Sequence, residues 1–223
     1  MRDRRTPLAR RGHGRRARRS GGARGDRRAR RRGRAAVSRL VLVRHCEPEE
    51  EARGRCYGSL DVGLSDAGIR HARELAVRLE NGGAVWTSPR LRARQTAAPL
   101  AAAARVDDDL RELDFGELEG RTYDEIAAGE PALYRAWMET PTRVKFPGGE
   151  SWADLKARVL RSLDRIERAG DAVVVTHGGV IRAALSEWLA IPDGAIFRID
   201  LGYGGITVAE RVAGMPIVRM VNG

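Results

Sequence analysis

The chain has 223 residues, a formal net charge of +11 and two cysteines. This length fits one sizeable domain rather than two, and two cysteines are too few for a disulfide framework or a zinc site. No apolar stretch reaches the roughly 18 residues of a membrane span. We therefore expect no membrane partner and a reducing, cytoplasmic location.

The positive charge is concentrated in the first 36 residues. Residues 1–36 hold 16 arginines and two aspartates, a net charge of +14, which leaves −3 for residues 37–223. With almost no large apolar side chains, this segment cannot offset its ordering entropy, and we expect a disordered tail. It is interpreted as an arm that contacts nucleic acid or another anionic surface, as a transit peptide, or as an artefact with translation starting near Val37. Residues 37–223 are expected to form the folded domain.

The first predicted element is a buried strand at 38–44, an apolar run that ends in Arg44 and His45. A charged, Gly-containing loop at 47–63 follows. A helix then starts at Ser65 and Asp66 and stops at 81–83. A short strand at 84–87 precedes an Ala-rich helix from 88 to about 104, in which Pro99 is expected to introduce a kink or a split.

The second half of the chain continues the alternation of strands and helices. We expect a short strand at 105–107, an irregular loop at 110–121, two short helices near 122–129 and 131–139, and an amphipathic helix after 147–149. A second buried strand at 172–177 ends in His177, a helix spans 179–189, and closing strands lie at 195–200, 205–211 and 215–220. The pattern predicts a three-layer α/β/α sandwich with a mostly parallel central sheet, extended by antiparallel closing strands.

Two of the four histidines stand at the ends of predicted buried strands. Ligands of open α/β sheets bind beyond the carboxyl ends of the strands, so we expect His45 and His177 to share one site. Arg44 favours an anionic substrate because guanidinium donors suit phosphate oxygens. A neutral imidazole can attack phosphorus, so a small phosphorylated substrate is expected. No paired carboxylates or Asp-rich loop suit a metal, and no cofactor is expected. His13 and His71 are expected to be solvated.

Six segments resemble, in order, those of the histidine phosphatase superfamily, which includes the cofactor-dependent phosphoglycerate mutases. The resemblance covers most of residues 38–223, and its segments are 42–45, 61–68, 88–97, 112–120, 148–151 and 176–179. It implies that His45 is the nucleophile and forms a phosphohistidine. It further implies that Arg44 and Arg92 clamp the phosphoryl oxygens, that His177 binds the phosphoryl group and stabilises transition-state charge, and that Glu112 protonates the leaving alkoxide as general acid.

Some of these assignments have alternatives. Arg92 and Arg94 also fit a solvated helix face, and Glu112 competes with other acids that could serve as loop or capping residues, namely Asp114, Glu117 and Glu119. Cys46 replaces the family's usual glycine, and either narrows the site or is a small buried residue, which we favour. Glu51 replaces an asparagine of the mutases, so its loop either turns away or binds another substrate group.

The resemblance predicts a metal-independent phosphomonoesterase. Residues 54–61 resemble the α-ribazole phosphatases, so Tyr57 and Gly58 are expected to bind substrate and α-ribazole 5′-phosphate is a candidate. The closest alternative is a cofactor-dependent phosphoglycerate mutase, which the length of the body and Glu51 disfavour. The alternative from another class is a non-catalytic phosphoryl-binding or RNA-binding module that uses the basic tail.

Overall fold

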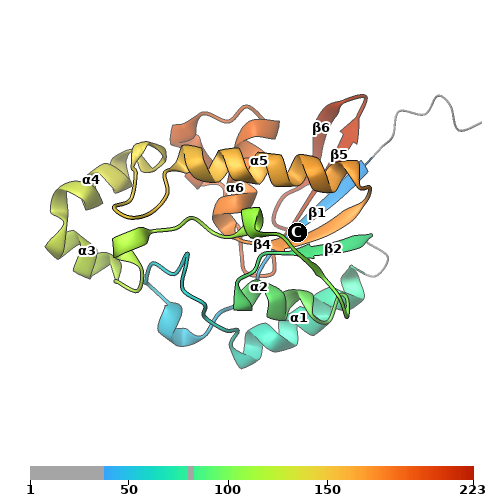
Figure 1. The fold of residues 1–223 in the computed structure, drawn as a ribbon, viewed down its shortest axis with the longest axis horizontal. Helices are drawn as coiled ribbons and strands as arrows, with labels where there is room; N and C mark the ends of the chain where they lie inside the picture. The colour runs from blue at the N-terminus through green and yellow to red at the C-terminus, as the bar shows by residue number, and fades with distance from the viewer. Residues whose placement is uncertain (1–37, 80–82) are drawn as a thin grey trace, which may run out of the picture. The chain divides into compact units, whose positions relative to one another are not determined.

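The computed structural model describes residues 38–79 and 83–223, and the expectations for residues 1–36 lie outside this part of the chain. A six-stranded sheet forms its centre, in the order β3-β2-β4-β1-β5-β6 (Figure 1). The strands are β1 (Ser38–Arg44), β2 (Ala84–Thr87), β3 (Arg105–Val106), β4 (Ala172–Thr176), β5 (Ile206–Val212) and β6 (Met215–Met220). β3, β2, β4 and β1 pair in parallel, while β5 and β6 pair antiparallel. The predicted mostly parallel sheet with antiparallel closing strands is therefore confirmed.

Helices cover both faces of the sheet, as Figure 1 shows. On one face lie α1 (Asp66–Arg78) and α2 (Leu91–Ala97), and on the other α5 (Trp152–Arg168) and α6 (Gly178–Trp188). Successive residues of β1 alternate between the two sides. Leu40 and Leu42 pack in the cluster formed with α5 and α6, whereas Val41 and Val43 pack with α1 and α2. This burial on both faces explains why the run is continuously apolar and confirms the three-layer sandwich.

A smaller helical pair lies beside the sandwich, at the left of Figure 1. α3 (Tyr123–Gly129) begins with a capping box between Thr122 and Glu125, and α4 (Pro131–Glu139) begins at a proline. Both helices were predicted. They pack over a separate apolar cluster that includes Trp137 and Phe146. Short 3₁₀ helices occupy Glu50–Ala52, Asp108–Leu110, Gly116–Leu118, Pro141–Arg143 and Asp193–Arg198. Within the described part of the chain, no helix is both long and apolar enough to cross a membrane.

Two predicted elements are wrong. The Ala-rich helix expected up to residue 104 ends at Ala97, because Pro99 lacks the amide hydrogen and its ring obstructs a continuing helix. The strand expected at 195–200 is replaced by the 3₁₀ helix Asp193–Arg198, which follows Pro192 and buries Ile196 among residues of α5 and α6. A short segment such as 195–200, with four apolar residues in six, does not distinguish a strand from a helical turn by its periodicity.

Candidate active site

The register of the sheet brings His45 and His177 together. Arg44, the last residue of β1, is paired with Thr176, the last residue of β4, so each histidine is the first residue beyond its strand. The amide of His45 donates to the carbonyl of Thr176 at 2.8 Å. The ring centroids of the two histidines are 5.2 Å apart, and both side chains are buried. The expected convergence of two distant histidines is thus present in the fold.

The hydrogen bonds of His45 define which ring nitrogen is free. Its Nδ1 lies 2.8 Å from the carbonyl oxygen of Cys46. A carbonyl only accepts, so Nδ1 carries the hydrogen and Nε2 presents its lone pair. Burial first, and then the positive charges of Arg92 and Arg44, hold the pKa of His45 well below its usual value. A neutral imidazole at neutral pH, oriented through Nδ1, is a nucleophile at Nε2.

His177 is held by a serine that sequence reasoning did not single out. Its Nε2 lies 2.7 Å from Oγ of Ser88, which follows β2, and the amide of Ser88 donates to Val175 in β4. Burial, the charge of Arg92 and then the neighbouring His45 lower the pKa of His177 well below its usual value. Its Nδ1 is buried and has no hydrogen-bond partner among the described residues. The sequence does show a hydroxyl directly after the predicted strand at 84–87. That this hydroxyl reaches His177 depends on the pairing of β2 with β4.

Arg44 lies at the mouth of the site. Its Nη1 donates to the carbonyl of Leu201, and its guanidinium carbon lies 4.1 Å from the centroid of the Tyr203 ring. The hydroxyl of Tyr203 lies 3.0 Å from that of Tyr57, and its ring centroid is 5.6 Å from that of His45. Tyr203 therefore packs against both Arg44 and His45. The sequence placed Tyr203 in a Gly-rich turn, and nothing there separated it from an ordinary loop aromatic.

Arg92 is fully buried in α2, which excludes the solvated helix face. Its Nη1 donates to the carbonyl of Leu60 at 2.9 Å, and its Nη2 donates to those of Tyr57 at 2.9 Å and Gly58 at 3.1 Å. Its Nε has no partner among the described residues. Arg92 therefore fixes the loop at 57–60 with its Nη groups while its charge acts on both histidines.

Glu112 lies at the N-terminus of α6, directly beyond His177. Its Oε1 accepts from the amide of Leu113 at 2.9 Å and its Oε2 from that of Gly179 at 3.1 Å. A Cβ on residue 179 would lie 2.2 Å from Oε1 of Glu112. The second glycine after His177 is therefore needed for the carboxylate to reach the positive end of the helix.

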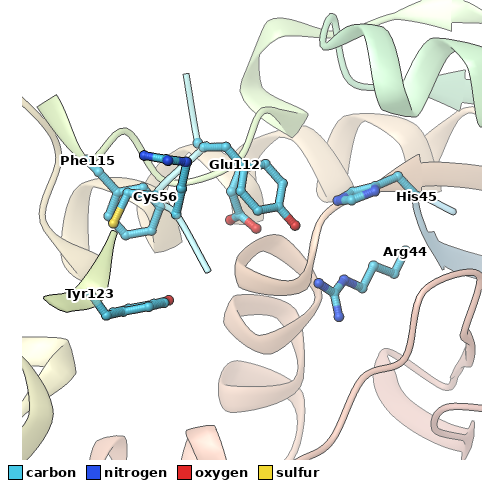
Figure 2. Close-up of a pocket in the computed structure, with 9 residues that line it drawn as sticks. Arg44, His45, Cys56, Glu112, Phe115 and Tyr123 are labelled. Atoms are coloured by element: carbon cyan, nitrogen blue, oxygen red, sulfur yellow. The ribbon is translucent and has the colours of Figure 1, made fainter. Parts of the chain in front are cut away.

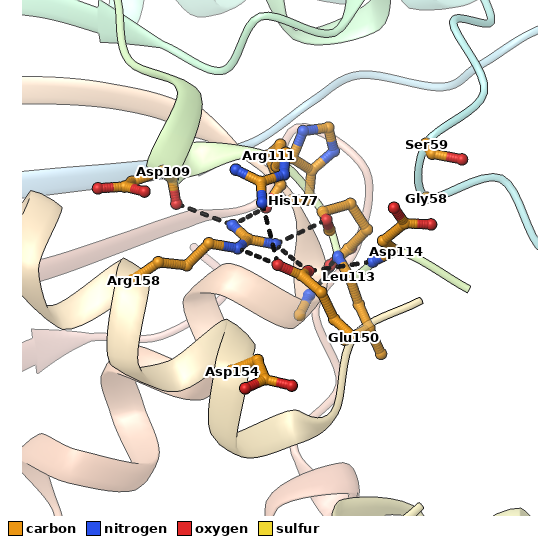
Figure 3. A network of polar contacts seen from close by, with 12 residues as sticks. Gly58, Ser59, Asp109, Arg111, Leu113, Asp114, Glu150, Asp154, Arg158 and His177 are labelled. Atoms are coloured by element: carbon orange, nitrogen blue, oxygen red, sulfur yellow. Dashed lines mark hydrogen bonds and ion pairs between the residues drawn. The ribbon is translucent and has the colours of Figure 1, made fainter. Parts of the chain in front are cut away.

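A buried ion pair fixes the backbone on which Glu112 stands (Figure 3). Arg158 in α5 donates through Nε and Nη2 to the two carboxylate oxygens of Glu150, at 2.8 and 2.6 Å. It also donates to the carbonyls of Asp109, Arg111 and Glu112 at 2.6 to 2.9 Å. Burial opposes ionisation of Glu150, but the hydrogen bonds and charge of Arg158 outweigh it, so the pKa of Glu150 is lowered. Glu150 belongs to the predicted segment 148–151, which thus holds the Arg158 side chain that binds the backbone carbonyl of Glu112.

Arg44, His45 and Glu112 line a pocket of about 110 Å³. In Figure 2, Glu112 lies between Arg44 and His45 on one side and Phe115 and Tyr123 on the other. The complete lining is Arg44, His45, Arg55, Cys56, Tyr57, Gly58, Glu112, Phe115 and Tyr123. Of the five residues expected to bind substrate, three line the pocket, whereas two do not: Arg44, Tyr57 and Gly58 line it, and Arg92 and His177 lie outside its lining. Across residues 38–79 and 83–223, no three His, Cys, Asp or Glu side chains gather as a metal ion would require.

A family model for the histidine phosphatase superfamily (branch 1) matches residues 40–223. The chain belongs to the histidine phosphatase superfamily. Phosphoserine phosphatase 1 of Hydrogenobacter thermophilus is 34% identical over 162 residues, which are 69% of this chain and 77% of that protein. Proteins named as phosphatases are therefore among those to which this chain is similar.

Two further comparisons define how far the similarity extends. A bifunctional protein of Mycobacterium tuberculosis is 37% identical over 200 residues, 85% of this chain but 55% of that protein. The chain thus spans about half the length of this relative and of two other mycobacterial relatives. The structure of the α-ribazole phosphatase of Shigella flexneri matches with a TM-score of 0.74 at 22% identity, over 83% of this chain and 96% of that one. This last match shows a common fold.

The chain departs from the family's usual residues at Cys46 and Glu51. Cys46 is fully buried, packs with Val41 and Val43, and its amide donates to Oγ1 of Thr96 at 3.0 Å. Burial raises the pKa of its thiol to about 11. It is the small buried residue that we favoured. Glu51 is exposed on the 3₁₀ helix Glu50–Ala52 and is not among the residues that line the pocket.

Proposed function

We propose that the enzyme hydrolyses a small phosphate monoester through a phosphohistidine at Nε2 of His45, without a metal ion. The observation that carries this proposal is the hydrogen bond from Nδ1 of His45 to the carbonyl of Cys46. It leaves the Nε2 lone pair as the free nucleophile, beside two guanidinium groups and a second imidazole. Phosphoryl transfer needs in-line positioning and positive groups around the equatorial oxygens, and the guanidinium groups near His45 support the proposal as the source of the positive charge.

In the first step, Nε2 of His45 forms a bond to phosphorus while the bond from phosphorus to the ester oxygen breaks. Glu112 transfers its proton to the departing oxygen, so an alcohol leaves. In the second step, water attacks the phosphohistidine, Glu112 takes the proton of the water, and His45 is released with inorganic phosphate. Arg44, Arg92 and His177 stabilise the charge on the phosphoryl oxygens in both steps. The unpartnered Nδ1 of His177 is a suitable donor to one of them.

For the substrate, we propose a phosphorylated metabolite and name α-ribazole 5′-phosphate as the first candidate. The sequence of residues 54–61 supports this choice, and these residues supply Tyr57 and Gly58 to the pocket. Phosphoserine is the competing candidate because a relative at 34% identity carries that name. Measuring kcat/KM for each compound in a panel of phosphorylated metabolites that includes both candidates ranks them.

Hydrolysis of a chromogenic phosphomonoester in the presence of a chelator tests the proposed chemistry. The wild-type enzyme is expected to turn over, and His45→Asn to lose at least roughly 10³-fold in kcat/KM. His71→Asn, a histidine of α1 that does not line the pocket, is the matched control and is expected to retain activity. A folded wild-type protein that requires added metal or shows no turnover would overturn the proposal.

A second assay separates the phosphatase from a mutase. Phosphoglycerate isomerisation is measured with and without bisphosphoglycerate. We expect slow hydrolysis or no reaction in both mixtures. Isomerisation that is stimulated by the bisphosphate and exceeds hydrolysis would assign the enzyme to the mutases instead.

A further inference from the structure

A second pocket adjoins the phosphoryl site. It has a volume of about 250 Å³ and shares Glu112, Phe115 and Tyr123 with the first pocket. Its remaining lining comes from α4, α5, α6 and the loops beside them, namely Leu113, Trp137, Pro141, Trp152, Leu155, Gly179, Arg182 and Phe197. Glu112 is the only carboxylate and Arg182 the only cation of this lining. The pocket is therefore a largely aromatic and aliphatic space that begins at the proposed general acid.

The inner wall of this second pocket is well packed. The ring of Trp137 lies 5.6 Å from that of Phe115 and 5.1 Å from that of Phe146, centroid to centroid. Trp137 is 8% exposed and Trp152 is 5% exposed. Aromatic rings in such contacts are fixed by their neighbours. The wall is thus preformed, as small-molecule sites usually are.

The rim of the second pocket, in contrast, leaves apolar surface in water. Tyr123 is 42% exposed and Phe197 is 46% exposed. A ligand that covers these rings removes apolar surface from water, which is favourable. The guanidinium carbon of Arg182 lies 5.6 Å from the Phe197 ring, and its Nη2 donates to the carbonyl of Ile199 at 3.0 Å. These contacts fix one side of the rim.

We propose that this second pocket binds the alcohol part of the substrate and selects an aromatic group there. The inference rests on the proposed function, in which Glu112 protonates the leaving oxygen. The phosphoryl group then lies on the His45 side of Glu112, and the atoms that follow the leaving oxygen extend past Phe115 and Tyr123. An apolar cavity of about 150 Å³ accommodates benzene, so the pocket has room for a two-ring aromatic.

Arg182 adds a polar feature to this alcohol subsite. Arg182 lines the pocket, so its guanidinium places a positive charge beside the alcohol. Burial lowers the pKa of Arg182, and the positive charge of Arg44 lowers it further. Together they outweigh Glu112, whose negative charge favours the charged form of Arg182. The subsite therefore suits an aromatic alcohol with an oxygen acceptor near Arg182.

The test uses alkyl phosphates whose leaving groups have similar acidity but differ in size. Ethyl phosphate, 2-phenylethyl phosphate and 2-(1-naphthyl)ethyl phosphate are compared by kcat/KM, with phosphoserine as a small polar reference. Filling an apolar pocket with each added group improves kcat/KM, and we expect the naphthyl ester to exceed ethyl phosphate by roughly tenfold or more. The naphthyl alcohol alone is expected to inhibit competitively.

Variants locate the selectivity. Phe197→Ser and, separately, Tyr123→Ser are expected to reduce the ratio of naphthyl to ethyl kcat/KM to near one, with thermal melting as the check on folding. Met215→Ala, an exposed apolar residue of β6, is the control and is expected to keep the wild-type ratio. Equal kcat/KM across the series in the wild type would overturn the alcohol subsite while leaving the phosphatase intact. Failure to hydrolyse any ester would instead count against the proposed function.

Discussion

Removal of the Arg158 side chain is expected to cost the fold several kcal/mol. This guanidinium is 4% exposed and makes a bidentate pair with Glu150, whose side chain is 15% exposed. It also donates three hydrogen bonds to the carbonyls of Asp109, Arg111 and Glu112. Arg158→Met preserves much of the aliphatic stem but leaves a carboxylate and three carbonyls without this partner.

The size of the expected loss in unfolding free energy follows from the burial of the Arg158–Glu150 ion pair. Removing one partner of a buried ion pair typically costs about 3–5 kcal/mol, because the other charge stays desolvated. Glu150 retains its bond from Arg111 at 3.1 Å and the amide of Asp114 at 3.2 Å, which places the expected cost near the lower end, at about 3 kcal/mol. That is a large share of a domain stability of about 5–15 kcal/mol.

Urea denaturation measures this cost as a change in the free energy of unfolding. Arg168→Met is the matched control on the same helix, because Arg168 is 78% exposed and pairs with Asp164, which is 53% exposed. Exposed pairs contribute about 0–1 kcal/mol, so the control is expected to change little. Glu150→Gln combined with Arg158→Met is expected to recover part of the loss. A cost for Arg158→Met no greater than that of Arg168→Met would refute the structural role of the pair.

Three further predictions address the site. Glu112→Gln is expected to lower kcat on alkyl phosphates by roughly 10²–10⁴-fold and on 4-nitrophenyl phosphate far less, because an activated leaving group needs no proton; equal losses would contradict the acid role. His45 and His177 bind protons below pH 6.5 when unfolded but resist them when folded. The free energy of unfolding of the wild type, relative to that of a His45→Asn/His177→Asn variant, should therefore fall by up to about 2.7 kcal/mol per pH unit as the pH drops below 6.5. If the two proteins lose stability equally as the pH falls, the imidazoles are not buried in their neutral form. Cys46, whose pKa is about 11, should resist iodoacetamide at pH 7.5 until the protein is unfolded, and rapid native alkylation would show that it is reactive.

The parts of the fold that the sequence predicts well are those where burial dictates residue type. Residues 40–43 of β1 and 172–175 of β4 are all apolar because both faces of the sheet are covered, and the histidines stand out just beyond these runs. Capping residues such as Ser65 and Thr122 mark helix starts through hydrogen bonds to nearby backbone. Both signals are local, so they can be read without knowing the tertiary structure.

The features that escaped prediction depend on contacts between distant segments. Ser88 meets His177 only because β2 lies beside β4, and Arg182 reaches the second pocket only because α6 packs over the 3₁₀ helix Asp193–Arg198. Arg92 was expected as a phosphoryl clamp, and its bonds to the loop at 57–60 follow from how that loop folds over α2. The 3₁₀ helix itself was mistaken for a strand because Ile196 is buried by tertiary packing rather than by a sheet.

The most direct test of the central claim is to trap the covalent intermediate. The enzyme is mixed with a ³²P-labelled phosphomonoester, quenched within milliseconds to seconds, digested and mapped. We expect one labelled peptide, phosphorylated on His45, with a bond that survives alkali and is lost in acid, and no label in His45→Asn. Steady turnover with no labelled protein at any quench time, or label on another residue, would contradict the account.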